Sequence, residues 1–507
     1  MAYKHGAYGE RVSSKTRSAS QVEENLVYFG VAPINLIRGY DDAGLINTPV
    51  RLRNLGEAQS KIGYSENWDS FSLCEVVDYH FNNTVENAGP IYIINVLDPD
   101  THRKKTQTTK SVGFSNGKGT YLANSMYNEK AKLPVYKTDD VKSAIADKTE
   151  GVDYSLEYNF TAGAVTITSL IDTDPLKDDV DVTFYEVDTS MIEAADIIGQ
   201  KSQSGTYSGI AAIALLYMRE NAVPNILAAP GWSHIPAVYR ALCSAAQKIN
   251  GHWDAFVNAD IPLTDNGTEV DTIAKAKNWA EKNGYTSAIS KVYWPQIRNG
   301  EKVYHLSTVG SHTMLCVDGS HQGVPSGIPF ESPSNKEIMA TDQYFGENSE
   351  NQGFDQTDGN DLNERGITTA VWWDGSWKLW GPHTAAYKYN GSMDASAIFD
   401  TNMRMLMYVT NGFQKRNGTT IDSPMTPNDK DSVVRSEQEE LDTLVGYGAL
   451  IGNPEVLFLE SDNPTSDMLN GDFVWDMLAT PTPPKKSATA RVAYTDEGFN
   501  AFFGGES

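Results

Sequence analysis

The 507-residue chain has few cysteines, and its basic side chains are outnumbered by acidic ones. Cys74, Cys243 and Cys316 are too few and too scattered for a disulfide framework or a cysteine-rich metal site, which favours a reducing compartment during folding. The 41 basic and 66 acidic side chains give a formal charge of -25. This charge argues against a nucleic-acid partner, because phosphate binding requires a basic surface.

Segments for export or membrane insertion are also lacking. The N-terminal residues are polar and contain no apolar core of a signal peptide. The longest apolar run, residues 210–218, is far shorter than the roughly 20 residues that span a bilayer, so we interpret it as a buried helix. We therefore expect no membrane partner.

Apolar residues are nonetheless sufficient for packed cores, at 40% of the chain, and the length predicts about three domains. Residues 26–29 and 91–96 are apolar runs typical of strands, and the second has the composition of a strand covered on both faces. Residues 224–229 predict another strand, followed by a helix capped by Ser233 and a further strand from residue 253. Such a unit predicts parallel strands joined by a right-handed crossover.

A different pattern begins at residue 101. Polar and apolar residues alternate over 154–160 and again over 180–184, which is typical of half-exposed antiparallel strands. We therefore expect an inserted antiparallel β-domain over residues 101–189.

The C-terminal third predicts a connection, a hairpin and two helices. Residues 346–366 are rich in Gly, Asn, Asp and Gln and predict a long exposed connection. The dipeptide Asp374-Gly375, between two apolar runs, is a strong hairpin signal. Helices are predicted over 398–413 and 432–445.

The predicted fold class is multidomain α/β and α+β, with a mixed-sheet core, strand-exchanging terminal arms and the inserted β-domain. The proposed division of the chain is an N-terminal arm (1–25), the first part of the core (26–100), the β-domain (101–189), the second part of the core (190–355), a C-terminal domain (356–489) and a C-terminal arm (490–507).

No catalytic, cofactor-binding or metal-binding group of residues stands out in the sequence. Residues 113–117 have the Gly-x-Ser-x-Gly spacing of a nucleophile elbow, but without the strand and helix that must flank it. Ser233 does lie between a strand and a helix, so an α/β hydrolase that uses Ser233 is the alternative to a structural protein. Neither a phosphate-binding loop nor a His or Cys pair at metal-ligand spacing occurs, so we expect no cofactor.

The two ends of the chain are more informative. A polar segment precedes the first apolar strand, and a proline-rich spacer at 481–484 precedes a last alternating stretch at 491–495. A strand that is connected to its domain only through an extended spacer has unpaired backbone N–H and C=O groups along its edges. These groups can pair with a strand of another chain. The alternative is that each end folds back on its own domain.

Several short motifs occur in order between residues 228 and 484, within a resemblance that spans about residues 26 to 502. They are AAPGWS (228–233), YHLST (304–308), PFESPSNK (329–336), LNERGI (362–367), LWG (379–381), LFLE (457–460), NPT (463–465) and PTPP (481–484). Together they resemble the contractile phage tail sheath proteins. Sheaths of R-type bacteriocins and related injection machines are similar too, so the resemblance does not choose among these systems.

The resemblance implies a structural subunit, not an enzyme, that forms stacked rings of six around a tail tube. Contraction of such a sheath drives the tube through the host envelope, and its partners are further copies of itself, the tube protein, and baseplate and tail terminator proteins. The expected location is the virion, after assembly in the host cytoplasm. A surface-layer or other self-assembling shell protein is a further alternative.

The resemblance also implies roles for particular residues. Terminal arms that add strands to neighbouring subunits would place the exchanged strands at Leu26, Val27, Tyr28 and Phe29 and at Arg491, Val492, Ala493, Tyr494 and Thr495. The inserted β-domain would project outward. The tube-facing helix would be residues 399–416, with Arg404, Lys415 and Arg416 as its basic side chains; ordinary surface charges on a packed helix are the alternative.

Overall fold

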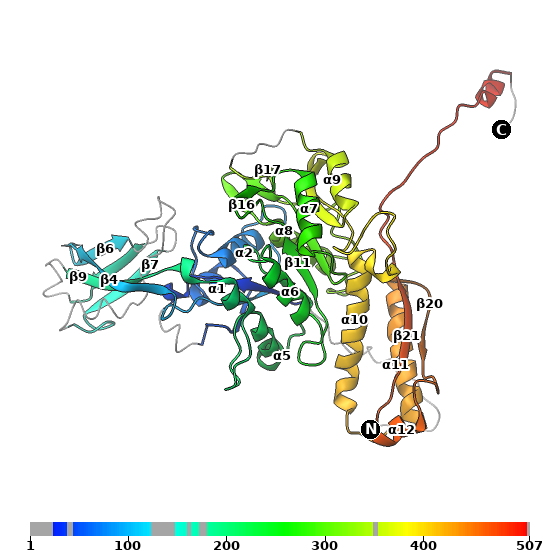
Figure 1. The fold of residues 1–507 in the computed structure, drawn as a ribbon, viewed down its shortest axis with the longest axis horizontal. Helices are drawn as coiled ribbons and strands as arrows, with labels where there is room; N and C mark the ends of the chain where they lie inside the picture. The colour runs from blue at the N-terminus through cyan, green and yellow to red at the C-terminus, as the bar shows by residue number, and fades with distance from the viewer. Residues whose placement is uncertain are drawn as a thin grey trace, which may run out of the picture.

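The computed structural model describes residues 24–37, 44–122, 148–159, 164–171, 180–347 and 353–503. Of the predicted N-terminal arm, only Glu24 and Asn25 are among the described residues. Three regions follow one another in Figure 1: a small β-module, a central α/β body, and a C-terminal group of long helices from which the end of the chain extends away.

An eight-stranded mixed sheet forms the centre of the body, in the order β19-β18-β14-β11-β10-β1-β3-β2. The six inner strands are parallel, and β2 and β19 are antiparallel edge strands. Continuous apolar runs build the interior: all five residues of β3 are buried. The strands are β1 (Leu26–Gly30), β2 (Pro49–Leu52), β3 (Ile91–Asn95), β10 (Ile226–Ala228), β11 (Phe256–Asp260), β14 (Ser290–Tyr293), β18 (Ile367–Trp373) and β19 (Ser376–Trp380).

The prediction that Leu26, Val27, Tyr28 and Phe29 form an exchanged strand is wrong. They belong to β1, which pairs in parallel with β10 on one edge and β3 on the other. All four side chains are fully buried. Because both edges of β1 are already hydrogen-bonded within the chain, this strand has none left for a neighbouring subunit.

Two groups of helices pack on the sheet. α2 (Ser72–Phe81) and α8 (Leu306–Gly319) contact each other and the central strands, whereas α6 (Pro236–Ala245) packs with α4 (Ala194–Ile198) and the 3-10 helix η4 (Gly209–Ile213). The predicted cap of α6 is wrong: α6 begins after Ile235, and the Ser233 hydroxyl instead donates to Asp260 at 3.3 Å.

The remaining helices and strands of the body complete its edges. α9 lies within 346–366, so the predicted exposed connection is partly helical. The elements are η1 (Ile34–Leu36), α1 (Leu55–Lys61), η3 (Thr189–Met191), α5 (Ala214–Glu220), β12 (Thr264–Asp265), β13 (Thr268–Glu269), α7 (Ile273–Asn283), β15 (Gln296–Asn299), β16 (Lys302–Tyr304), β17 (Asp342–Tyr344) and α9 (Gln356–Asn363).

The β-module consists of antiparallel strands outside the main sheet. β4 (Arg103–Val112) pairs with β9 (Val180–Val187), so the chain enters and leaves the module side by side. Beyond this pair lies a sheet of β5 (Phe114–Ser115), β6 (Lys118–Leu122), β8 (Ala164–Ser169) and β7 (Tyr154–Asn159). The predicted fold class, a mixed-sheet core accompanied by antiparallel sheets, is confirmed.

The C-terminal region contains the two longest described helices and a two-stranded sheet. α10 (Asp400–Asn417) and α11 (Pro427–Gly446) confirm the two predicted helices. They enclose a separate apolar core with the antiparallel pair β20 (Leu450–Leu457) and β21 (Asp476–Pro481). The smaller elements are η5 (Ala395–Ala397), η6 (Gly418–Thr420), α12 (Thr465–Asn470) and η7 (Glu497–Phe503).

The predicted hairpin is also confirmed. β18 and β19 are joined by Asp374 and Gly375, whose φ angles of 51° and 82° are both left-handed. None of the helices in the described ranges is long and apolar enough to cross a membrane.

Candidate assembly surfaces

After the prolines at 481–484 the chain lines a pocket on the body as far as Ala488, and beyond it the C-terminal arm extends into solvent (Figure 1). Val492 is 93% exposed, Tyr494 84% and Phe502 81%. Residues 491–495 pair with no strand among the described residues, and an exposed extended segment with apolar side chains at alternate positions is suited to pairing with another chain. Their exchange with a neighbour stays a prediction.

The two-stranded sheet of β20 and β21 offers an edge for such pairing. Each strand has one partner strand in the described part of the chain. The outer edge of β20 is partly covered, because the Gln438 side chain of α11 donates to the Pro454 carbonyl at 2.8 Å and accepts from the Val456 N–H at 3.0 Å. Within the described ranges, the free edge is therefore that of β21. One face packs on the helices, while Ile451 and Leu478 are 45% and 55% exposed on the other. A two-stranded sheet is marginal by itself and gains from added strands.

Arg404 is not a tube-facing residue, so that prediction is wrong. Its side chain is 3% exposed and forms ion pairs with Glu24, at 2.5 Å, and with Asp318 at the end of α8. Burial raises the pKa of Glu24, and the Arg404 guanidinium acts in the opposite direction. The cluster therefore ties the start of β1 to α8 and α10 inside the protein.

The other two basic residues of α10 differ from Arg404. Arg416 is 31% exposed, and its guanidinium donates to both carboxylate oxygens of buried Glu437 on α11, at 3.2 and 2.6 Å. Its charge is therefore largely engaged in joining the two helices. Lys415 is half-buried, and its role at a tube surface stays a prediction.

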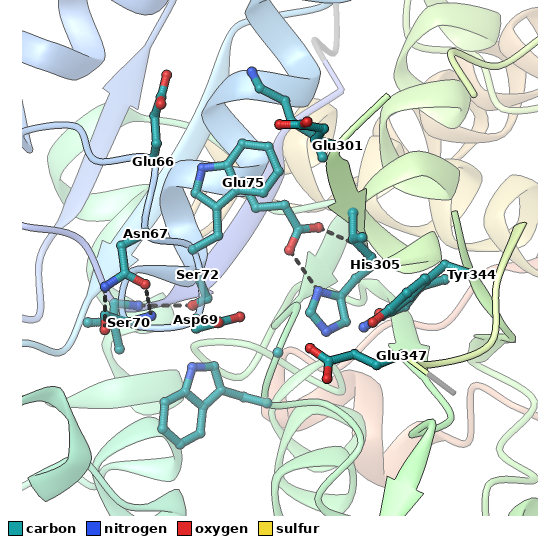
Figure 2. Close-up of a pocket in the computed structure, with 17 residues that line it drawn as sticks. Glu66, Asn67, Asp69, Ser70, Ser72, Glu75, Glu301, His305, Tyr344 and Glu347 are labelled. Atoms are coloured by element: carbon teal, nitrogen blue, oxygen red, sulfur yellow. Dashed lines mark hydrogen bonds and ion pairs between the residues drawn. The ribbon is translucent and has the colours of Figure 1, made fainter. Parts of the chain in front are cut away.

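A charged pocket of about 840 Å³ opens where β1 and β10 end. It lies where successive strands of the parallel sheet diverge to opposite sides, the usual place for ligands in α/β folds. Figure 2 shows the His305 ring next to the Glu347 carboxylate, with Asp69 on the opposite side of the pocket. Trp68, Trp232 and Tyr344 contribute aromatic surface.

His305 carries the main electrostatic feature of the pocket. Its Nδ1 lies 2.7 Å from Glu75 Oε2, and its backbone N–H donates to Glu75 Oε1 at 2.7 Å (Figure 2). Burial alone would lower the His305 pKa, but the Glu75 and Asp260 carboxylates outweigh burial and raise it to about 9. His305 is therefore protonated at neutral pH and cannot act as a general base.

The hydrolase alternative finds no support in this geometry. Ser233 is fully buried, and its hydroxyl donates to Asp260, which also accepts a hydrogen bond from the Ser307 hydroxyl. A serine nucleophile needs a hydrogen-bonded base, and no histidine bonds Ser233 in the described part of the chain. Among these same residues, no group of three or more His, Cys, Asp or Glu side chains is arranged to hold a metal ion.

Sequence comparison finds curated relatives along the whole chain. The chain is 25% identical over 514 residues to the tail sheath protein of Burkholderia phage BcepMu, with 99% of both chains covered. A 23% identity to the tail sheath protein of Escherichia phage P2 covers 60% of this chain and 71% of that protein. No family model matches the chain.

Two solved structures share the fold. A chain in the cryo-EM structure of the anti-feeding prophage baseplate has a TM-score of 0.53 at 14% identity, covering 98% of this chain and 100% of that one. A chain in the contracted sheath complex of an extracellular contractile injection system, PVC, has a TM-score of 0.51 at 12% identity, covering 98% and 99%. The resemblance to contractile tail sheath proteins is confirmed.

Proposed function

We propose that this chain, a relative of phage tail sheath proteins, is the structural subunit of a contractile sheath. It polymerises as stacked hexameric rings around a tail tube and contracts to drive the tube through the host cell envelope for genome delivery. Its role is structural, without catalysis. It is assembled in the host cytoplasm and becomes part of the virion.

The observation that carries this proposal is that the chain has both an unpaired extended segment, the C-terminal arm, and a two-stranded sheet, β20–β21, that could accept a further strand. The C-terminal arm has exposed alternating side chains and no partner strand in the described ranges, whereas β21 keeps a free edge. Insertion of the arm of one copy beside the sheet of another supplies both with hydrogen bonds. Each backbone hydrogen bond contributes about 1 kcal/mol net, so a few bonds per arm, repeated at every subunit, join the lattice firmly.

A second donor strand, if the N-terminal arm supplies one, precedes Glu24. β1 is enclosed within its own sheet, so an N-terminal exchange falls on residues 1–23, which lie outside the described residues.

We infer that the C-terminal domain lies nearest the tube and that the β-module projects outward. The module lies far from α10 and α11, across the body, which supports this arrangement (Figure 1). The remaining partners proposed are the baseplate and tail terminator proteins.

Removal of the C-terminal arm tests the proposal. The full chain is expected to form striated tubes in electron micrographs, and a variant without residues 490–507 to remain a folded, soluble monomer by circular dichroism and sedimentation. A variant without residues 504–507 alone is the control and should still assemble. Flat lattices, or unaltered tubes from the chain without 490–507, would contradict the proposed function.

A further inference from the structure

We propose that the pocket beside His305 binds a linear aliphatic polyamine, a chain of methylene groups that carries several ammonium charges. Residues of the segment before α2 and of the sheet formed by β15, β16 and β17 line this pocket (Figure 2). Its volume of about 840 Å³ is in the range of roughly 300–1,000 Å³ that small-molecule sites usually have. The site lies within one chain, so the inference goes beyond the proposed function and does not depend on assembly.

Negative charge exceeds positive charge in the walls of the pocket. Five acidic side chains line it, against Lys302 and His305 as the two basic ones. The Lys302 ammonium is paired with Asp78 and donates to its two carboxylate oxygens at 2.8 and 2.9 Å. The His305 ring is paired with Glu75 at 2.7 Å. Both positive charges are thus balanced by carboxylates, and the charge that remains for a ligand is negative.

The other acidic side chains are spread around the pocket. Figure 2 shows four separate positions, occupied by the carboxylates of Glu66, Asp69, Glu301 and Glu347. Glu66, Asp69 and Glu301 are exposed and form no ion pair in the described part of the chain. Carboxylates in separate positions do not converge on one metal ion, and among the described residues no group of three or more His, Cys, Asp or Glu side chains does so. They suit an extended cation with several separated charges.

Aromatic rings supply the surface for the methylene groups and a further attraction for the ammonium groups. Two rings of the pocket already bind cations of the chain. The Lys302 Nζ lies 5.4 Å from the centre of the Trp68 ring, and the Arg298 Cζ lies 4.9 Å from the centre of the Tyr344 ring. The third ring, Trp232, is half-buried and has no cation over it among the described residues. Because ring faces attract ammonium groups, Trp232 is the ring that we expect the ligand to contact.

Titration of the full chain with spermidine, a linear polyamine with three charges, tests the inference. Isothermal titration calorimetry at fixed ionic strength should show saturable binding, and butylamine, with a single ammonium group, should not saturate over the same concentrations. Asp69→Asn and Glu301→Gln should each weaken spermidine binding by about 2- to 5-fold, as expected for the loss of one exposed ion pair. Trp232→Leu should weaken it by about 2- to 5-fold through loss of the cation–π contact. The three side chains are exposed or half-buried, so circular dichroism should show that each variant folds.

An acid outside the pocket separates this site from the general attraction of a polycation to an acidic protein. Glu439→Gln is the matched control, because Glu439 is exposed on α11, which contributes no residue to the pocket. This variant should bind spermidine as the parent does. The inference is overturned if no saturable binding occurs, if butylamine binds as tightly as spermidine, or if Asp69→Asn and Glu301→Gln behave like Glu439→Gln. Tube formation by a chain that binds no spermidine would retain the proposed function and remove only this inference.

Discussion

At the scale of single residues, buried ion pairs join α10 to the central body. Lys291 of β14 and Asp400, the first residue of α10, are both fully buried with their charged atoms 2.6 Å apart. Lys291 also donates to the backbone oxygens of Gly381 and His383, at 2.6 and 3.3 Å. Buried ion pairs need such additional hydrogen bonds to offset desolvation, so removing one partner is costly.

Arg404→Met is expected to destabilise the protein. The substitution leaves the carboxylates of Glu24 and Asp318 buried without their cation, and breaking a buried pair in this way costs about 3–5 kcal/mol. Denaturant unfolding measures the change. Lys415→Met, on the same helix but half-buried, is the control and should change stability by less than about 0.5 kcal/mol. Normal stability of Arg404→Met, combined with loss of tube attachment, would instead favour a tube-facing role.

The Glu75–His305 pair predicts a pH dependence of stability. The folded-state pKa of His305 is raised to about 9, above the ordinary value of about 6.5 for an unfolded chain. The stabilisation is therefore complete below about pH 6.5 and is lost as pH rises through 9. Unfolding free energies measured from pH 6 to 10 should fall for the parent and fall less for His305→Gln. Parallel curves would contradict the assignment.

At the scale of secondary-structure elements, α8 illustrates tight packing without an amphipathic pattern. Eleven of its 14 residues are buried, because it is covered by α2 as well as by the sheet. Gly310 lies against the Tyr293 ring so closely that a Cβ atom there would be 2.4 Å from ring atoms. A glycine is thus required for the helix to approach the sheet.

Gly310→Ala should therefore destabilise the protein even though alanine is the better helix former. Overpacking costs about 1–3 kcal/mol, against a gain of at most about 1 kcal/mol in helix propensity. Thermal denaturation should show a lower Tm. Gly319→Ala at the end of the same helix is the matched control, since its nearest neighbour is the Ser326 hydroxyl at 3.8 Å, and it should be neutral or stabilising. Equal effects at the two positions would be inconsistent with close packing at Gly310.

Local patterns predicted some elements and missed others for physical reasons. The β18–β19 hairpin and helices α10 and α11 were predictable from turn residues and from one apolar stripe. α8 was missed because a helix buried nearly all round shows no 3.6-residue period. The pairing of β20 with β21 was not predicted, because the two strands are separated in the sequence by α12. Pairing between separated strands leaves no local signal in the sequence.

The candidate site was predicted in part. The exposed C-terminal arm follows from its proline spacer and alternation, whereas the exchange at Leu26 to Phe29 came from the family resemblance and is wrong. The local sequence favoured the interior, since four successive apolar residues suit a strand covered on both faces. The burial of Arg404 depends on Glu24 and Asp318, which are distant in sequence and invisible to a local pattern.

At the scale of the whole molecule, the β-module is attached so that it can be removed. β4 and β9 run side by side, and Arg103 is the Cα partner of Val187. The two ends of the insertion thus meet at the surface of the body. No strand of the main sheet belongs to the module, and among the described residues Val187, at the end of β9, is the one residue of the module in the central apolar core.

Excision of the module is expected to preserve the fold and the polymer. A chain in which a short Gly-Ser linker replaces residues 105–185 should unfold at nearly the parental temperature and form tubes of smaller outer diameter in electron micrographs. A matched excision of β20 to β21, residues 449–482, should abolish tubes. Loss of assembly after removal of the module would show that the module makes contacts between subunits.

The burial of β1 determines how the protein bears mechanical load. A pull on the residues ahead of Glu24 runs along the axis of a strand held by parallel neighbours on both edges. Such tension strains both hydrogen-bond ladders together in shear, instead of peeling them apart one bond at a time. The ion pairs of Arg404 with Glu24 and Asp318 would pass part of this force to α8 and α10 before it reaches the sheet. A force applied ahead of Glu24 would therefore act on a strand that is hydrogen-bonded on both edges.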